Sequence, residues 1–118
     1  MKTESKLSAA VQRCIADCLK CYEVCVRTKV HCLDMGGSHA ERHHITLMSA
    51  CADACSTSAH VMLMESEFQN RFCMLCADIC ERCAADCERF VDDDKMQSCA
   101  LTCRQCAETC MDMTREKV

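Results

Sequence analysis

The sequence contains no proline, no tryptophan and only two glycines, Gly36 and Gly37, which are adjacent. All-β folds and loop-rich disulfide proteins draw heavily on glycine and proline for their turns, so this composition argues against both classes. One tyrosine and three phenylalanines are too few for an aromatic platform on which nucleic-acid bases stack. The net charge of −4, with no basic run, also argues against a phosphate-binding surface. No nucleic-acid partner is therefore expected.

Long apolar runs are absent as well. The apolar runs that do occur are short, as at Val61–Met64, so no segment is expected to span a membrane. Residues 1–6 lack the apolar run that a secretory signal peptide requires, which predicts a cytoplasmic protein. The length of 118 residues fits one domain, over 1–118, and not two.

What the chain has in excess is cysteine, with 16 among 118 residues. Such a content in a short chain usually indicates a disulfide scaffold. Here the cysteines recur about one helical turn apart, which separates their Cβ atoms by roughly 5–6 Å. A disulfide requires roughly 3.5–4.5 Å between these atoms. Free thiols are therefore expected.

Hydrophobic periodicity and turn signals predict four helices, over residues 5–34, 38–64, 66–91 and 95–115. Their short connections require successive helices to alternate in direction. The predicted fold is therefore all-α, an antiparallel up-down-up-down four-helix bundle with a cysteine-lined core.

The expected helix boundaries follow from local signals. The glycine pair at 36–37 supplies the left-handed geometry that ends a helix. Ser38 with Glu41, and Ser66 with Gln69, have the spacing of a capping box, which predicts that the second and third helices open there. The acidic run 92–94 suits the N-terminus of the last helix, where the helix dipole favours negative charge.

The cysteines are spaced almost entirely in steps of three or four, so each helix carries them along one face. If they were only small core residues, the bundle axis would be underfilled, and cavities of this kind are costly. Soft, thiol-binding metal ions on the axis are the better explanation. The candidate metal ligands are Cys14, Cys18, Cys21, Cys25, Cys32, Cys51, Cys55, Cys73, Cys76, Cys80, Cys83, Cys87, Cys99, Cys103, Cys106 and Cys110.

A second stripe on the first helix is apolar and is rotated by roughly 100° from the cysteines. We expect it to fill seams between helices or to form an oligomer contact. Its members are Ile15, Leu19, Tyr22, Val26, Val30 and Leu33.

Charge decides among the metals that bind thiolates. Iron–sulfur clusters usually take cysteines from loops, and the spacing around Cys73–Cys83 does not match their motifs. Four tetrahedral Zn²⁺ ions on sixteen thiolates would leave eight buried negative charges. Cu(I) is soft, singly charged and satisfied by two or three thiolates, so sixteen Cu(I) ions would make the core neutral. The CxxxC step, present seven times, places two thiolates beside one such ion.

The chain resembles the bacterial copper storage proteins. The resemblance rests on the runs CIADCLKCYEVC, CADAC, CMLCADICERCAADC and CALTCRQCAETC. It implies storage of many Cu(I) ions on the sixteen cysteines and, for members without a signal peptide, a cytosolic location and a homotetramer. The sequence departs from the family in the second helix, which offers only Cys51 and Cys55. That departure leaves the number of ions open.

Other soft side chains fall in phase with the cysteines and are candidate metal ligands: His44, Met48, Met62, Met96 and Met113. Antiparallel order gathers His44, Met48 and Met96 at one end of the bundle, with Met35 and His43 nearby. Because imidazole and thioether bind Cu(I) more weakly than thiolate, we expect copper to pass through this end. Met62 and Met113 lie at the opposite end. His31, His39 and His60 are out of phase, and we expect them in solvent.

The predicted function is storage and detoxification of Cu(I), with a copper chaperone as a possible partner. The alternative is an Fe–S or Zn-thiolate protein acting as electron carrier or metal sensor. An enzyme is not expected, because the CxxC steps lie mid-helix on the buried face, whereas catalytic thiols are exposed.

Overall fold

The computed structural model of the chain describes residues 7–115. This range forms four α-helices and one short 3-10 helix: α1 (Ala9–Met35), η1 (Gly37–Ala40), α2 (Arg42–Leu63), α3 (Gln69–Glu88) and α4 (Asp94–Arg115). None of the described helices is long and apolar enough to cross a bilayer.

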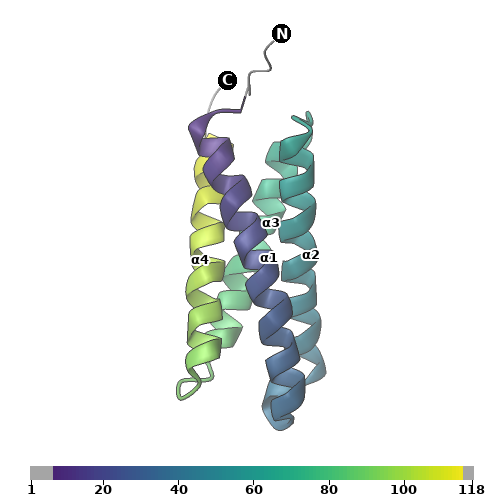
Figure 1. The fold of residues 1–118 in the computed structure, drawn as a ribbon, viewed down its shortest axis with the longest axis vertical. Helices are drawn as coiled ribbons and strands as arrows, with labels where there is room; N and C mark the ends of the chain where they lie inside the picture. Colours follow the sequence, from purple (N-terminus) through teal and green to yellow (C-terminus); the bar gives the residue numbers. More distant parts are fainter. Residues whose placement is uncertain (1–6, 116–118) are drawn as a thin grey trace.

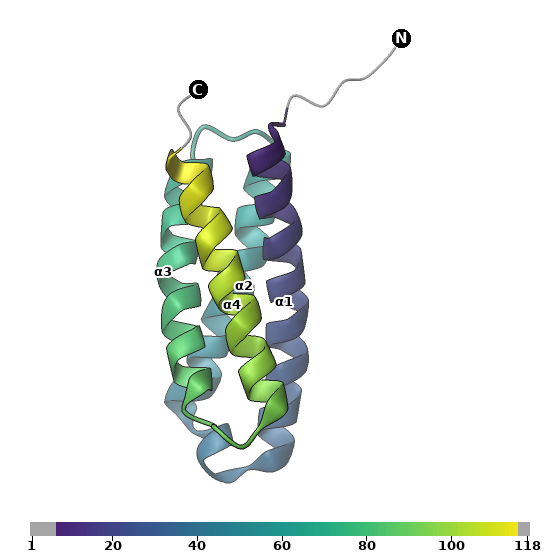
Figure 2. The same ribbon diagram turned by 90° about the vertical axis from the view of Figure 1, so that its left-hand side faces the viewer.

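The helices pack as a bundle in which each runs opposite to its predecessor (Figure 1). Contacts join α1 to α2, α2 to α3, α3 to α4 and α4 to α1. The start of α1 and the end of α4 lie at one end, and the α1–α2 and α3–α4 connections lie at the other (Figure 2). The predicted all-α antiparallel four-helix bundle is therefore confirmed.

The first helix begins and ends on identifiable caps. The Ser8 hydroxyl accepts a hydrogen bond from the backbone N–H of Val11 at 3.1 Å, so α1 opens at Ala9. The predicted start at Ser5 lies outside the described residues. At the other end Gly36 has φ of 72° and donates its N–H to the carbonyl of Cys32 at 3.1 Å. The predicted termination at the glycine pair is confirmed.

The two predicted capping boxes are wrong. Ser38 lies inside η1, and α2 opens after Glu41, whose side chain makes no capping hydrogen bond. The Ser66 hydroxyl accepts the N–H of Phe68 at 3.0 Å, so it orders the turn before α3 rather than the helix itself. In both places the helix begins about three residues later than predicted, because the chain needs those residues to reverse direction between antiparallel helices.

The third helix ends at Glu88, three residues before the predicted end at Val91. Gln97 of α4 accounts for the difference, because its side-chain amide donates to the carbonyls of Glu88 and Phe90. These carbonyls are satisfied from the neighbouring helix, so the chain leaves α3 early. As predicted, the acidic run stabilises the start of α4, because the Asp93 carboxylate accepts hydrogen bonds from the backbone N–H groups of Lys95 and Met96.

Alanine, rather than the larger aliphatic residues, lets the helices approach one another. Six alanines are buried beside the cysteines: Ala52, Ala59, Ala77, Ala84, Ala100 and Ala107. On the predicted apolar stripe Ile15 is buried and Val26 packs against the core. The other four members, Leu19, Tyr22, Val30 and Leu33, remain 41–54% exposed. They do not fill the seams.

Candidate metal centre

All sixteen cysteines have no exposed surface, and none forms a disulfide. They line the axis of the bundle from all four helices, as the phase of their spacing predicts. Neighbouring Sγ atoms lie between 3.5 Å, for Cys14 and Cys110, and 4.0 Å, for Cys25 and Cys99. Four thiolates at about 2.3 Å from one ion would be about 3.8 Å apart, so the observed spacing accepts metal with little rearrangement.

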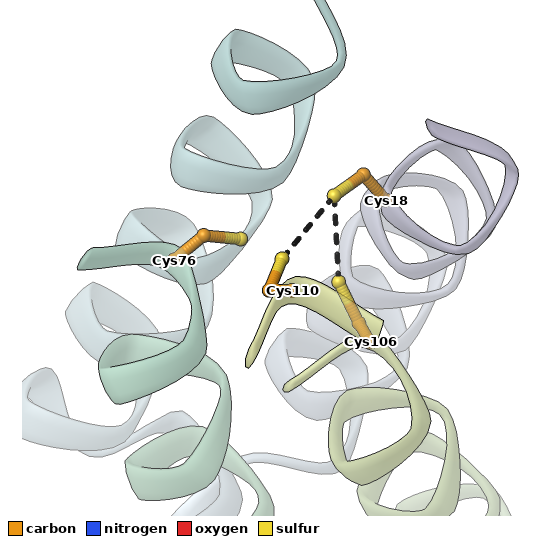
Figure 3. A group of neighbouring side chains, drawn as sticks. All are labelled: Cys18, Cys76, Cys106 and Cys110. Atoms are coloured by element: carbon orange, nitrogen blue, oxygen red, sulfur yellow. Dashed lines mark hydrogen bonds between the residues drawn. The ribbon is translucent and has the colours of Figure 1, made fainter. Parts of the chain in front are cut away.

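Thiols from different helices converge in compact groups. Figure 3 shows one of them, in which Cys18 of α1 and Cys76 of α3 face Cys106 and Cys110 of α4. Within each group the Sγ atoms all lie within 4.8 Å of one another. The groups are Cys18, Cys76, Cys106 and Cys110; Cys21, Cys55, Cys80 and Cys106; Cys21, Cys25, Cys51 and Cys103; and Cys14, Cys73 and Cys110.

These groups share members. Cys106 and Cys110 each belong to two groups, and so does Cys21. A cysteine that closes one tetrahedral site cannot close a second one independently. The thiols therefore form a continuous lining rather than a set of separate four-ligand sites.

Among residues 7–115 the core contains no buried lysine or arginine that could neutralise thiolates. The buried polar side chains in residues 7–115 are Thr28, His44, Ser58 and Thr109, with no lysine or arginine among them. Hydrogen bonds with neighbouring thiols, together with burial, raise the pKa of Cys80 and Cys103. Burial raises the pKa of the Cys32 thiol to about 11. A raised pKa favours the protonated thiol, so without metal Cys32, Cys80 and Cys103 are protonated at neutral pH.

At the end formed by the two connections, Cys32 is surrounded by the predicted soft side chains. Its Sγ lies 3.3 Å from Nε2 of His44, 3.4 Å from Sδ of Met96 and 4.0 Å from Sδ of Met48. All three partners are fully buried. We call these four residues the mouth cluster. His43 and Met35, which were expected near this cluster, are both exposed.

A polar chain behind His44 was not found by sequence reasoning. The Asp86 carboxylate accepts a hydrogen bond from Nδ1 of His44 and another from Arg89. Burial alone would raise the pKa of Asp86, but these two hydrogen bonds outweigh it and lower the pKa. When the ring proton is on Nδ1 and is donated to Asp86, Nε2 is left as an acceptor that faces Cys32, the arrangement typical of metal-binding histidines. Asp86 directly precedes Cys87, so a search beside the stripe could have found it.

The opposite end holds the two remaining methionines that were predicted in phase. Met62 is fully buried, and its Sδ lies 3.6 Å from Sγ of Cys73. Met113 is 2% exposed on the last turns of α4. This end contains no histidine among the described residues of its core, so its donor set is thinner than that of the mouth cluster.

The prediction for the remaining histidines is right at one position and wrong at two. His60 is exposed, as expected. His31 and His39 are not free in solvent, because their side chains are only 20% and 15% exposed and both bind Asp93. Helical phase placed His31 off the cysteine stripe correctly, but only the fold brings η1 and the α3–α4 connection beside it.

The family of copper storage proteins matches residues 7–115 of the chain. A protein from Nitrosospira multiformis of known structure is 45% identical, over 89% of this chain and 94% of its own, with a TM-score of 0.84. The Cu(I)-bound copper storage protein BsCsp3 of Bacillus subtilis is 36% identical, over 89% and 98%, with a TM-score of 0.83.

A cytosolic copper storage protein from Streptomyces lividans, solved with five coppers, is 25% identical to the chain. The match covers 92% of this chain and 95% of that one, with a TM-score of 0.80. The likeness therefore spans the bundle from its first helix to its last. The chain belongs to the copper storage protein family.

Proposed function

We propose that the sixteen cysteines hold Cu(I) as one shared thiolate lining with about one ion per cysteine. As a member of its family, the protein binds several Cu(I) ions through core cysteines for storage, and it is not an enzyme. The observation that supports the larger capacity is the sharing of Cys21, Cys106 and Cys110 between thiol groups. Shared thiolates suit an ion that is satisfied by two or three of them.

Charge supports the same stoichiometry. Sixteen thiolates with sixteen Cu(I) ions are neutral, and the described core offers no lysine or arginine to balance a deficit. Four Zn²⁺ ions would leave eight negative charges in a buried tube, which is costly. The Zn-thiolate alternative is therefore less favourable than copper storage.

Anaerobic titration of the reduced protein with Cu(I), in the presence of a competing chelator, tests the capacity. We expect saturation near sixteen equivalents per chain and a colourless product, with Zn²⁺ unable to displace the copper. Saturation near four equivalents would contradict the shared lining. Broad visible absorption in anaerobically isolated protein would instead support an iron–sulfur centre.

Histidine and methionine side chains extend the proposed ligand set beyond the cysteines. We assign His44, Met48 and Met96 as the residues through which Cu(I) passes, and Met62 and Met113 as weaker ligands at the opposite end. The contacts of Cys32 with all three mouth residues support the first assignment. A thioether or neutral imidazole adds no charge and binds Cu(I) less tightly than thiolate, so it can transfer the ion inward.

We further propose that residues 1–118 act as one domain in a reducing cytoplasm and receive copper from a chaperone. Free thiols persist where thioredoxin and glutathione keep them reduced. The Streptomyces lividans relative, described as cytosolic, supports this location. Loading from a Cu(I)-charged chaperone in place of free Cu(I) tests the last step, and no transfer would contradict it.

An oligomer, by resemblance a homotetramer, is proposed to cover the exposed apolar residues of α1. Leu19, Tyr22, Val30 and Leu33 present 41–54% of their surface. Substituting Val30 and Leu33 by glutamate should dissociate the assembly in size-exclusion chromatography with light scattering. Leu101→Glu, at a position 72% exposed on α4, is the matched control and should leave it intact. A monomeric unsubstituted protein would refute this proposal.

A further inference from the structure

Two histidines and one carboxylate that the copper core does not use converge beside the mouth cluster. His31 of α1 and His39 of η1 each direct Nε2 at the same oxygen, Oδ2 of Asp93, at 2.8 and 2.9 Å. The three ligand atoms all lie within 4.8 Å of one another. None of the three residues belongs to a cysteine stripe.

The fold holds the carboxylate in place through its other oxygen. Oδ1 of Asp93 accepts the backbone N–H groups of Lys95 at 3.0 Å and Met96 at 3.2 Å, which caps α4. Oδ2 is thereby left for the two imidazoles. A ligand whose orientation is fixed before binding loses little freedom when it binds an ion.

The histidines are also positioned by packing. The ring of His39 lies 4.2 Å from that of Phe90, and the rings of His31 and His39 meet edge to face at 5.8 Å. Their side chains and that of Asp93 are only 14–20% exposed. A hollow of about 580 Å³, lined by all three and by Met35, gives solvent access to the cluster and room for water to complete a coordination shell.

We propose that His31, His39 and Asp93 form a binding site for one divalent transition-metal ion of the Zn²⁺ type, separate from the Cu(I) core. Two imidazole nitrogens and one carboxylate oxygen are borderline to hard donors, which suit divalent ions, whereas Cu(I) prefers the thiolates of the core. Three protein ligands with an open fourth position are a common zinc arrangement.

The distances fit this assignment with small movements. Ligands about 2.1 Å from a tetrahedral ion are about 3.4 Å apart, so each imidazole has to withdraw from Asp93 by only about 0.5 Å. The ring protons that now bind Oδ2 would move to Nδ1, and the ion would take their place. Because the three residues come from α1, η1 and the α3–α4 connection, the ion would cross-link these elements at the mouth end.

The test uses the full chain saturated anaerobically with Cu(I), so that the core thiols are occupied. Co²⁺ is the probe, because its visible bands report coordination and its sulfur charge-transfer band in the near ultraviolet reports thiolate ligands. We expect one Co²⁺ per chain, bound without that charge-transfer band and displaced by Zn²⁺. Copper measured in the same samples shows separately whether the proposed storage function holds.

Two variants identify the ligands. His31→Gln with His39→Gln should weaken Co²⁺ binding by at least about 100-fold, since even outer-shell partners are worth 10- to 100-fold. Asp93→Asn keeps an acceptor for the α4 cap and should weaken binding by about 10-fold or more. His43→Gln with His60→Gln, at two exposed histidines, is the matched control. Circular dichroism checks that each variant remains helical.

Three results would overturn the proposal. They are failure of the Cu(I)-saturated unsubstituted protein to bind Co²⁺, equal binding by the variant with His31 and His39 replaced, and a sulfur charge-transfer band on the bound Co²⁺. A fourth such result is loss of binding in the His43 and His60 control, which would place the ion elsewhere.

Discussion

Nε2 of His44 lies 3.3 Å from Sγ of Cys32, at the end of the bundle where the helix connections meet. Cys32 makes its other sulfur contacts with Met96 and Met48. The thiol of α1 nearest this end is therefore surrounded by weaker, uncharged copper ligands. This graded order, with weak ligands outside and thiolates inside, is what a path for Cu(I) into the core requires.

Replacement of the mouth ligands should change rates and leave capacity nearly unchanged. We expect His44→Ala, Met48→Ala and Met96→Ala together to slow both Cu(I) uptake and removal by chelators, because the outer binding steps are lost. Stopped-flow measurement of uptake and an anaerobic titration give the two quantities. Met62→Ala with Met113→Ala is the comparison at the other end. If that variant is the slower one, copper uses the opposite end.

The Asp86 carboxylate should influence the copper rate without touching copper. Asp86→Ala removes the acceptor that fixes the His44 ring, and we expect uptake to slow by about 10-fold. The matched control is Asp78→Ala on the same helix, where the carboxylate only pairs with Arg82 at the surface. Equal rates for the Asp86 variant and the unsubstituted protein would show that ring orientation does not limit uptake.

The reduced, metal-free protein should already be helical. The Ser8 and Asp93 caps, the glycine termination of α1 and the buried alanines do not depend on copper. Zinc fingers behave in the opposite way and are unfolded without their ion. Far-ultraviolet circular dichroism of the reduced apoprotein measures this, and a coil spectrum that becomes helical only with Cu(I) would contradict the prediction.

Alkaline pH should destabilise the metal-free protein. In the unfolded chain thiols ionise near their ordinary pKa of 9.0. In the folded protein burial raises the pKa of Cys32 to about 11. A raised pKa means that the folded state binds more protons, so its stability falls as pH rises from about 9 through 11. Urea denaturation of the reduced apoprotein at pH 8 and pH 10.5 tests this. Equal stability at both pH values would refute it.

Larger side chains at the buried alanine positions should destabilise the folded protein. Ala84 has no exposed surface, and we expect Ala84→Leu to lower the free energy of unfolding by about 1–3 kcal/mol through overpacking. Ala50→Leu, at an exposed position of α2, should change it by less than about 0.5 kcal/mol. Urea denaturation of the reduced apoproteins gives both values. A neutral Ala84→Leu would mean that the helices can separate at this level.

Residue spacing alone determined which side chains face the axis. Cysteines at steps of three and four share one face of a helix whatever the helix packs against, so Cys14 and Cys110 could be placed in the core without a structure. The same phase argument brought His44, Met48 and Met96 to one end, because short connections force antiparallel order. The family resemblance, carried by the same cysteine runs, gave copper storage as the function.

Tertiary structure decided everything that depends on contacts between helices. The serines at 38 and 66 match a capping box locally. Yet α2 and α3 begin later than these serines predict, because the reversal of direction needs more residues. Asp86 and Asp93 acquire their histidine partners only when α1, η1, α2, α3 and the α3–α4 connection come together. The shared thiol groups likewise depend on how far each helix is shifted along its neighbour. Helical phase fixes the face on which a residue lies, but not the partner that it meets there.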